Sequence, residues 1–148
     1  MRVCLIIPPS PFLLDERVFV QLGILKIASA LEEQNYTVDM IDLSGVENYT
    51  DVLTDYTKRK DRADVFGITA TTPQVPYAVK ISQHIKALLP AKQSKVILGG
   101  PHVTLMHTAA KREAKKNLVG SDRATKDVEA LKSFFDVLVC GDGEIAIF

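Results

Sequence analysis

The sequence contains no tryptophan and only two cysteines, and its formal net charge is zero. Because Cys4 and Cys140 each lie within an apolar run, they exclude a disulfide framework and indicate reduced, buried thiols. A zero net charge provides no general attraction for nucleic acid or for an anionic membrane. We therefore expect a cytoplasmic protein whose partners include neither nucleic acid nor membrane.

The chain also lacks an apolar run of the roughly 20 residues that a membrane-spanning helix requires. The apolar start at residues 1–7 stops at Pro8 and Pro9 with no small-residue cleavage site after it, so we interpret it as a strand and not as a signal peptide. A length of 148 residues with 47% hydrophobic content fits one globular domain, residues 1–148, with a single core.

Short runs rich in β-branched residues alternate with longer segments of helical period. The runs that we expect to be strands are residues 3–7, 37–41, 65–69, 96–98 and 137–139. The segments that we expect to be helices are 18–34, 73–89, 105–116 and 122–135, with a break at 117–121, and 48–62 is a short helix at best. This alternation is typical of a doubly wound α/β domain with a five-stranded parallel sheet of order 2-1-3-4-5.

Ligands of such domains bind beyond the carboxyl ends of the strands. The loop after the first strand, residues 8–12, holds three prolines, which have no amide hydrogen to donate to a phosphate. It matches neither the Gly-x-Gly-x-x-Gly of dinucleotide-binding proteins nor a P-loop, and it lacks the acidic residues of a phosphoacceptor domain. The sequence therefore argues against a phosphate-cradling site.

The loops after the third, fourth and fifth strands contain small residues. Gly99 and Gly100 follow an apolar run, so a flat or bulky ligand could approach the backbone there, although a tight turn without a ligand fits equally well. Residues 69–72 provide hydroxyl groups around a narrow slot, and Thr72 could instead cap the helix that follows. Residues 141–144 again expose the backbone; Asp142 and Glu144 could bind a metal, but helix capping explains them more simply, so we expect no metal site.

His102 is the single histidine expected at the ligand-facing end of a strand. It could ligate a metal or donate to a cofactor, but ordering of the loop is the simpler interpretation. No Ser-His-Asp or Cys-His arrangement and no suitable pair of carboxylates is evident, so we expect no catalytic residues in this chain. A basic cluster is interpreted as the solvated face of a helix: Lys111, Arg112, Lys115 and Lys116.

Several short segments, taken in order and spacing, resemble the amino-terminal cobalamin-binding domain of cobalamin-dependent radical S-adenosylmethionine (SAM) proteins, which include methyltransferases and Fe–S oxidoreductases. These segments are residues 23–31, 38–42, 67–72, 98–104 and 141–144. The resemblance implies a flavodoxin-like, Rossmann-like three-layer sandwich with a corrin ring over the strand ends. The nucleotide tail of the cofactor would enter a slot lined by the third and fourth strands.

The resemblance also implies a set of cofactor-binding residues. Pro8 and Ser10 would flank the cobalt face, and Thr69 and Thr71 would contact the tail. Gly99 and Gly100 would allow the close approach of the tail, and Gly141 and Gly143 would border the macrocycle. The full set is Pro8, Ser10, Thr69, Ala70, Thr71, Gly99, Gly100, Pro101, His102, Gly141, Gly143 and Glu144.

The chain departs from related domains in two ways. Residues 8–13 replace the Asp-x-His-x-x-Gly motif whose histidine ligates cobalt, so we expect cobalt without a protein ligand, with His102 as the remaining candidate. The Cys-x-x-x-Cys-x-x-Cys motif of radical SAM enzymes is missing, and two cysteines cannot hold a [4Fe–4S] cluster. We therefore expect a non-catalytic amino-terminal fragment whose parent binds the cluster and SAM in a carboxyl-terminal barrel.

Two alternatives remain open at the level of sequence. The domain could have lost its cofactor and could serve as an interaction or substrate-recognition platform for a radical SAM barrel, and the missing cobalt-ligating histidine fits this interpretation as well. The chain could also be a stand-alone enzyme of the doubly wound class acting on a small molecule, although the sequence identifies no substrate for it.

Overall fold

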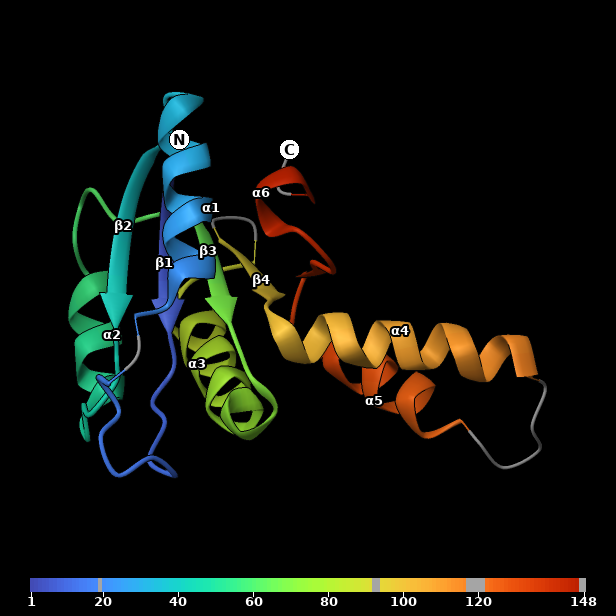
Figure 1. The fold of residues 1–148 in the computed structure, drawn as a ribbon. Coiled ribbons are helices and arrows are strands. Elements are labelled where there is room, and N and C mark those ends of the chain that lie inside the picture. Colours follow the sequence, from blue (N-terminus) through green and yellow to red (C-terminus); the bar gives the residue numbers. More distant parts are fainter. Residues whose placement is uncertain (19, 92–93, 117–121, 147–148) are drawn as a thin grey trace.

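The fold is a five-stranded sheet with helices on both faces, seen in a computed structural model that describes residues 1–18, 20–91, 94–116 and 122–146 (Figure 1). The strands are β1 (Arg2–Ile7), β2 (Thr37–Asp42), β3 (Val65–Thr69), β4 (Lys95–Gly99) and β5 (Val137–Leu138). All neighbouring strands pair in parallel, in the order β2-β1-β3-β4-β5. The predicted doubly wound architecture and strand order are confirmed.

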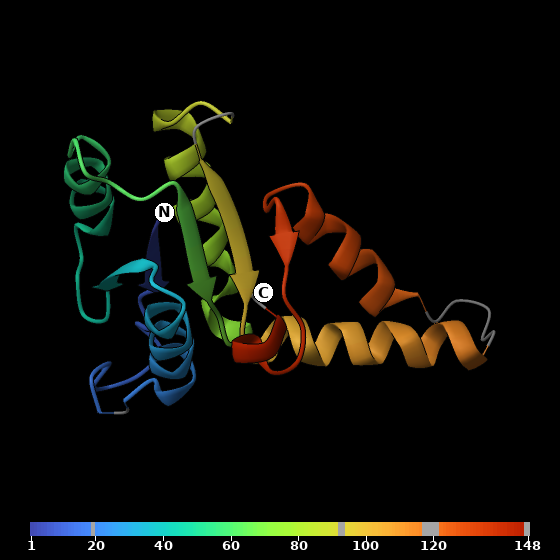
Figure 2. The same cartoon turned by 90° about the horizontal axis from the view of Figure 1, so that it is seen from above.

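Helices connect the strands as the alternation predicts. They are α1 (Leu22–Glu33), α2 (Tyr49–Thr57), the 3₁₀ turn η1 (Thr72–Gln74), α3 (Val75–Leu88), α4 (Pro101–Lys116), α5 (Arg123–Lys132) and α6 (Gly143–Ala146). Seen from above, α1 and α6 lie on one face of the sheet, while α2 and α3 lie on the other (Figure 2). None of the described helices is long and apolar enough to span a membrane.

Three predicted helix boundaries are wrong. The first helix begins at Leu22 instead of residue 18. The apolar pattern continues before the helix through Val18 and Val20, but these side chains are 58% and 71% exposed and do not join the core. The fourth begins at Pro101 and not at residue 105, because proline is accepted in the first turn of a helix. The fifth ends at Lys132, and Phe135 packs into the core from the turn that follows. The expected break at 117–121 lies outside the described residues.

The two faces of the sheet are packed differently. On one face the side chains of Cys4, Phe66 and Leu98 belong to a large core that α2 and α3 cover. On the other face α1 packs on the odd-numbered residues of β1 through a smaller core: Val3, Leu5, Ile7, Ile24, Ala28 and Leu31. The α1 face therefore holds less buried apolar volume over β3, β4 and β5 than the opposite face does.

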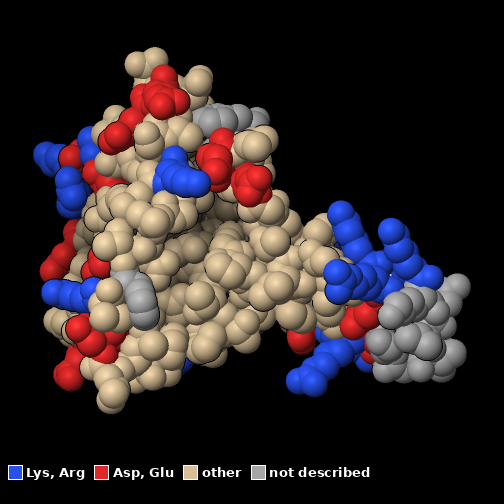
Figure 3. Space-filling view, in the orientation of Figure 1, with Lys and Arg blue, Asp and Glu red and all other residues tan. Residues whose placement is uncertain are grey.

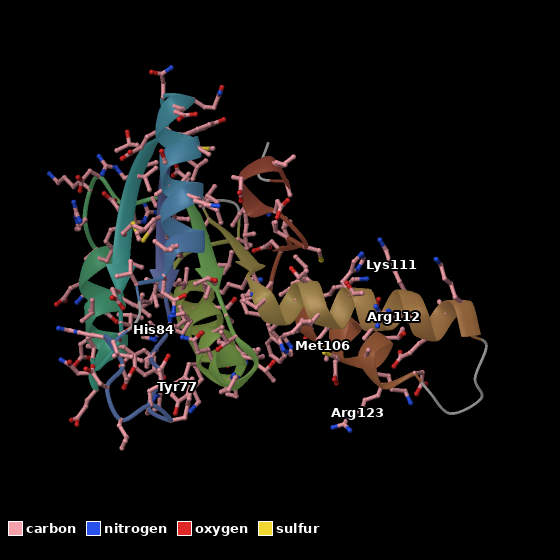
Figure 4. All side chains as sticks on the ribbon, viewed as in Figure 1. Tyr77, His84, Met106, Lys111, Arg112 and Arg123 are labelled. Atoms are coloured by element: carbon pink, nitrogen blue, oxygen red, sulfur yellow. The ribbon has the colours of Figure 1, made fainter. Side chains whose placement is uncertain are left out.

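Helices α4 and α5 pack on each other and project sideways from the sheet as an arm (Figures 1 and 2). Lys111 and Arg112 lie along the projecting part of α4, away from α3 with its Tyr77 and His84 (Figure 4). Lys111, Arg112 and Lys115 are exposed, as the sequence indicates for a solvated helix face. The arm is tied internally, because the Glu113 carboxylate accepts hydrogen bonds from the backbone of Ala124 and Thr125 at 3.0 Å each.

The turn from β4 to α4 is held tightly against the end of β3. Gly100 has φ +98°, and a Cβ atom added there would lie 2.7 Å from Thr69 Oγ1 and 2.8 Å from the amide nitrogen of Ala70. The Ala70 amide donates to the Gly99 carbonyl at 3.1 Å, and the His102 amide donates to the Ala70 carbonyl at 3.1 Å. Only glycine fits this position, and the turn fixes where α4 begins.

We expect Phe66→Ala to lower the free energy of unfolding by about 3–5 kcal/mol, because Phe66 is fully buried and packs edge-on against Tyr56 with ring centroids 6.2 Å apart. Urea unfolding followed by circular dichroism measures the change. Phe12→Ala is the matched control: Phe12 is 50% exposed and should cost less than about 0.5 kcal/mol. Equal losses in the two variants would contradict this assignment of the core.

Gly100→Ala should destabilise the fold by about 1–3 kcal/mol or more, because it combines an unfavourable φ with overlap of the new methyl group with Thr69 and Ala70. Gly23→Ala is the control, since Gly23 lies in α1 with no atom within 4 Å of an added Cβ. It should raise the free energy of unfolding by about 0.5–1 kcal/mol. Thermal and urea unfolding of both variants test this difference, which a tolerated Gly100→Ala would refute.

Candidate functional site

A cavity of about 610 Å³ opens on the α1 face of the sheet, between α1, α6 and the first turn of α4. Its walls are mainly apolar, and Figure 3 shows this part of the surface as a hollow almost free of charged atoms. The apolar side chains that line it are Leu5, Ile24, Ile27, Ile97, Leu105 and Val139. A concave, mostly apolar site of this volume is the usual form of a pocket for a small molecule.

The cavity exists because the strands beneath it carry small residues. Gly67, Thr69 and Gly99 point toward the α1 face at the carboxyl-terminal parts of β3 and β4. The Leu5 side chain leans over Gly67, where an added Cβ would lie only 2.9 Å from Leu5 Cδ2. Since α1 packs chiefly on β1, the space above the ends of β3 and β4 is bordered by Leu5 and Ile97 but remains open.

The glycines around the cavity have different roles. Gly141, with φ +87°, and Gly23 have no atom within 4 Å of an added Cβ, and a Cβ on Gly99 would make only an ordinary contact of 3.7 Å with the Val139 carbonyl. These positions leave open space. In contrast, Gly100 is required by the turn. At Gly143, where α6 packs on α1, an added Cβ would lie 2.7 Å from Ile27 Cδ1, so the end of that side chain would have to shift.

Few polar groups face the cavity. The Thr104 hydroxyl is already engaged, since it accepts from the Gly141 amide at 3.0 Å and donates to the Gly100 carbonyl at 3.2 Å. The Thr69 hydroxyl makes no hydrogen bond within the described part of the chain and is available to a ligand. Lys26, Asp142 and Glu144 stand at the rim. The arrangement favours a largely apolar guest with one or two hydrogen-bonding groups.

The structure brings part of the predicted set together in this cavity. The residues that line it are Thr69, Gly99, Gly100, Pro101, Gly141, Gly143 and Glu144. The other predicted residues, Pro8, Ser10, Ala70, Thr71 and His102, lie at the ends of β1, β3 and β4 but do not line it. Contact between any of these residues and a cofactor stays a prediction.

Sequence reasoning missed the residue that organises this second group, Gln74. Its side chain is 2% exposed and accepts hydrogen bonds at Oε1 from the amide (3.0 Å) and hydroxyl (2.9 Å) of Thr71. Its Nε2 donates to the Pro8 carbonyl at 3.2 Å and to Ser10 Oγ at 2.7 Å. The cap of the following turn is therefore Thr71 and not Thr72, and the pair of Thr71 with a glutamine three residues later is a capping-box pattern that the sequence could have revealed.

His102 is buried at the same edge. Its Nδ1 lies 3.1 Å from Thr72 Oγ1, and burial lowers the pKa of its imidazole, while the nearby Asp127 carboxylate acts in the opposite direction. This contact agrees with the structural role that the sequence favours. Among the described residues, no group of three His, Cys, Asp or Glu side chains is placed to hold a metal ion.

Solved structures with a similar fold include two of TsrM, a radical SAM methyltransferase from Kitasatospora setae. One contains a tryptophan substrate and a SAM analogue, with 20% identity, a TM-score of 0.59, and coverage of 72% of this chain and 20% of that one. The other contains cobalamin and a [4Fe–4S] cluster, with 20% identity, a TM-score of 0.58, and coverage of 73% and 20%. This chain thus matches only about a fifth of TsrM.

A third similar structure is a cobalamin-binding protein from Desulfitobacterium hafniense DCB-2. It shares 12% identity with a TM-score of 0.57, and the match covers 98% of this chain and 55% of that one. At these identities the likeness concerns the fold. No curated protein sequence matches the chain significantly.

A family model, in contrast, matches the sequence itself. The model of the B12 binding domain aligns with residues 16–127, which is well over half of the chain. The alignment includes α1, β3, β4 and the first turn of α4, which form three sides of the cavity. The expected resemblance is confirmed, and the chain belongs to the B12-binding domain family, whose cofactor is cobalamin.

Proposed function

We propose that this chain binds cobalamin with the nucleotide tail in the cavity between α1 and α6 and the corrin ring over the carboxyl ends of β3, β4 and β5. The observation that carries the proposal is the position of the cavity. It opens at the carboxyl ends of the strands on the sheet face where small residues leave space, and α1, β3, β4 and the first turn of α4, which line much of it, lie in the region that matches the family model. Such strand ends are where open α/β sheets bind their ligands.

The residues that line the cavity fit the tail. An aromatic base gains free energy from burial against the aliphatic walls, such as Ile24 and Ile97. The free Thr69 hydroxyl can donate to a ring nitrogen or accept from a ribose hydroxyl. Gly99 and Gly141 leave backbone exposed at the mouth, so that a flat macrocycle can lie close to the main chain.

The protein provides no cobalt ligand in this proposal. The loop after β1 contains no histidine, and His102 is buried and in contact with Thr72. If the base is held in the cavity, residues 8–13 would offer no imidazole to the cobalt of the bound cofactor.

We propose further that the domain serves a radical SAM protein that carries out methyl transfer or related radical chemistry. Bound cobalamin supplies a cobalt centre that can carry a methyl group. The residues of this chain bind and orient the cofactor, while a barrel in the same assembly would bind the [4Fe–4S] cluster and SAM. The support is the fold shared with a fifth of TsrM and the lack of a catalytic constellation among the described residues.

Purified protein mixed with hydroxocobalamin should retain corrin absorbance after desalting, with about one cofactor per chain. Gly99→Leu should weaken binding at least tenfold, or about 1.4 kcal/mol, because the added side chain would occupy the cavity beside Val139. Equilibrium dialysis with absorbance detection measures both affinities.

Ala87→Leu is the matched control, since it adds a similar volume on the exposed side of α3, on the opposite face of the sheet. It should bind as the unaltered chain does. Complete loss of absorbance from the unaltered chain, with a folded circular dichroism spectrum, would refute cobalamin binding and would favour the cofactor-free platform. Unchanged affinity in Gly99→Leu would refute the cavity as the site of the tail.

A further inference from the structure

We infer that the cavity selects among cobalt corrins by the base at the end of the nucleotide tail, and that it takes a benzimidazole in preference to a purine. The inference rests on the proposed function, because it assigns the tail to this cavity. Its basis is the shortage of hydrogen-bonding groups that are free to meet a buried base. The floor, the walls and the rim of the cavity each contribute to this shortage.

The floor of the cavity is formed by β3 and β4, and each of these strands has a neighbour on both sides. β3 lies between β1 and β4, and β4 lies between β3 and β5. Gly67, for example, is aligned with Leu5 of β1 and with Ile97 of β4. Because the sheet uses the amide and carbonyl groups of such strands, the floor has few backbone groups left for a ligand.

Among the described residues, the walls carry two hydroxyl groups, and one of them is free. Thr104 Oγ1 is engaged by the Gly141 amide and the Gly100 carbonyl, whereas Thr69 Oγ1 has no hydrogen bond within the described part of the chain. A Cβ atom at residue 100 would lie 2.7 Å from Thr69 Oγ1, so the glycine there also leaves this hydroxyl uncovered. A buried base thus meets a single free hydroxyl.

The charged side chains of the cavity lie at its rim. Lys26 and Asp142 are exposed, and Glu144 is partly exposed. Water already solvates these groups, so they gain little free energy by turning to a base inside the cavity. The inner surface is instead aliphatic, with side chains of Leu5, Ile24, Ile27, Ile97 and Val139.

Corrins carry different bases, and these match the cavity unequally. Cobalamin carries 5,6-dimethylbenzimidazole, which when detached from cobalt has one ring nitrogen to accept a hydrogen bond, and the Thr69 hydroxyl can donate it. Adenine is of similar size but has an amino group and three ring nitrogens that are not bonded to the ribose. Each polar group buried without a partner lowers affinity by roughly tenfold. The cavity therefore discriminates by hydrogen bonding and not by size.

The test compares cobalamin with the analogue that carries adenine in place of dimethylbenzimidazole. Equilibrium dialysis with absorbance detection gives the two affinities. Titration of each free corrin with acid gives the fraction whose base is detached from cobalt, and each affinity is corrected for that fraction. The unaltered chain should bind the adenine analogue about tenfold more weakly or worse. Equal corrected affinities would overturn the inference.

Ile97→Thr should reduce the preference, because it keeps a β-branched side chain in the strand but replaces apolar surface of the cavity by a hydroxyl. The ratio of the two affinities should fall by about threefold or more. Val137→Thr is the matched control, since Val137 is aligned with Ile97 on β5, is 47% exposed and does not line the cavity. It should leave the ratio unchanged. The same ratio in Ile97→Thr as in the unaltered chain would contradict the inference.

Thr69→Val tests the hydroxyl itself and decides the question if Ile97→Thr does not fold. It removes Oγ1 with little change in shape and should weaken cobalamin by about two- to tenfold, as expected for the loss of one hydrogen bond. Cobinamide, a corrin without the nucleotide tail, should bind Thr69→Val and the unaltered chain equally. An unchanged affinity for cobalamin, or an equal loss for cobinamide, would overturn the role of Thr69 in holding the base.

The experiment separates this inference from the proposed function. Equal corrected affinities, or variants that change neither ratio nor affinity, would leave cobalamin binding intact and remove the selection of the base. An unaltered chain that is folded by circular dichroism but retains neither corrin would overturn the proposed function and this inference with it.

Discussion

The unequal packing of the two sheet faces is the constraint on which the site depends. A parallel sheet is normally covered on both faces, and here the face under α2 and α3 is filled by large side chains such as Phe66, Ile81 and Leu98. On the α1 face, the glycines of β3 and β4 cannot reach a covering helix. The fold obtains its stability chiefly from one face, and this leaves the other face free to hold an apolar guest.

Because the two sheet faces are packed differently, Gly99 and Gly100 in the turn after β4 have different roles. Gly100 brings the end of β4 against Thr69 and Ala70, which fixes the edge of the sheet, while the bare Cα of Gly99 faces open space beside Val139. The second glycine thus serves the fold, whereas the first leaves space at the cavity. Because the two residues are adjacent, the turn that begins α4 also forms part of the wall of the cavity.

The sequence was sufficient to predict the strands and their order, since continuous apolar runs bounded by turns have few alternatives in a chain of this length. The start of α1 could not be predicted because Val18 and Val20 extend the apolar period although both are exposed. The apolar periodicity of a sequence does not distinguish an exposed apolar residue from a buried one. Glycine-rich loops likewise indicated where a ligand could approach, but periodicity could not separate Gly99 from Gly100, because that distinction depends on the neighbouring strand.

The burial of Gln74, a polar residue, could not be predicted from the sequence either. A glutamine in the first turn of a helix is usually solvated, and only the tertiary packing of β1 beside β3 places its amide within reach of Pro8 and Ser10. The result is a strand edge with two unlike halves. One half is closed by a saturated hydrogen-bond network, and the other is open and apolar.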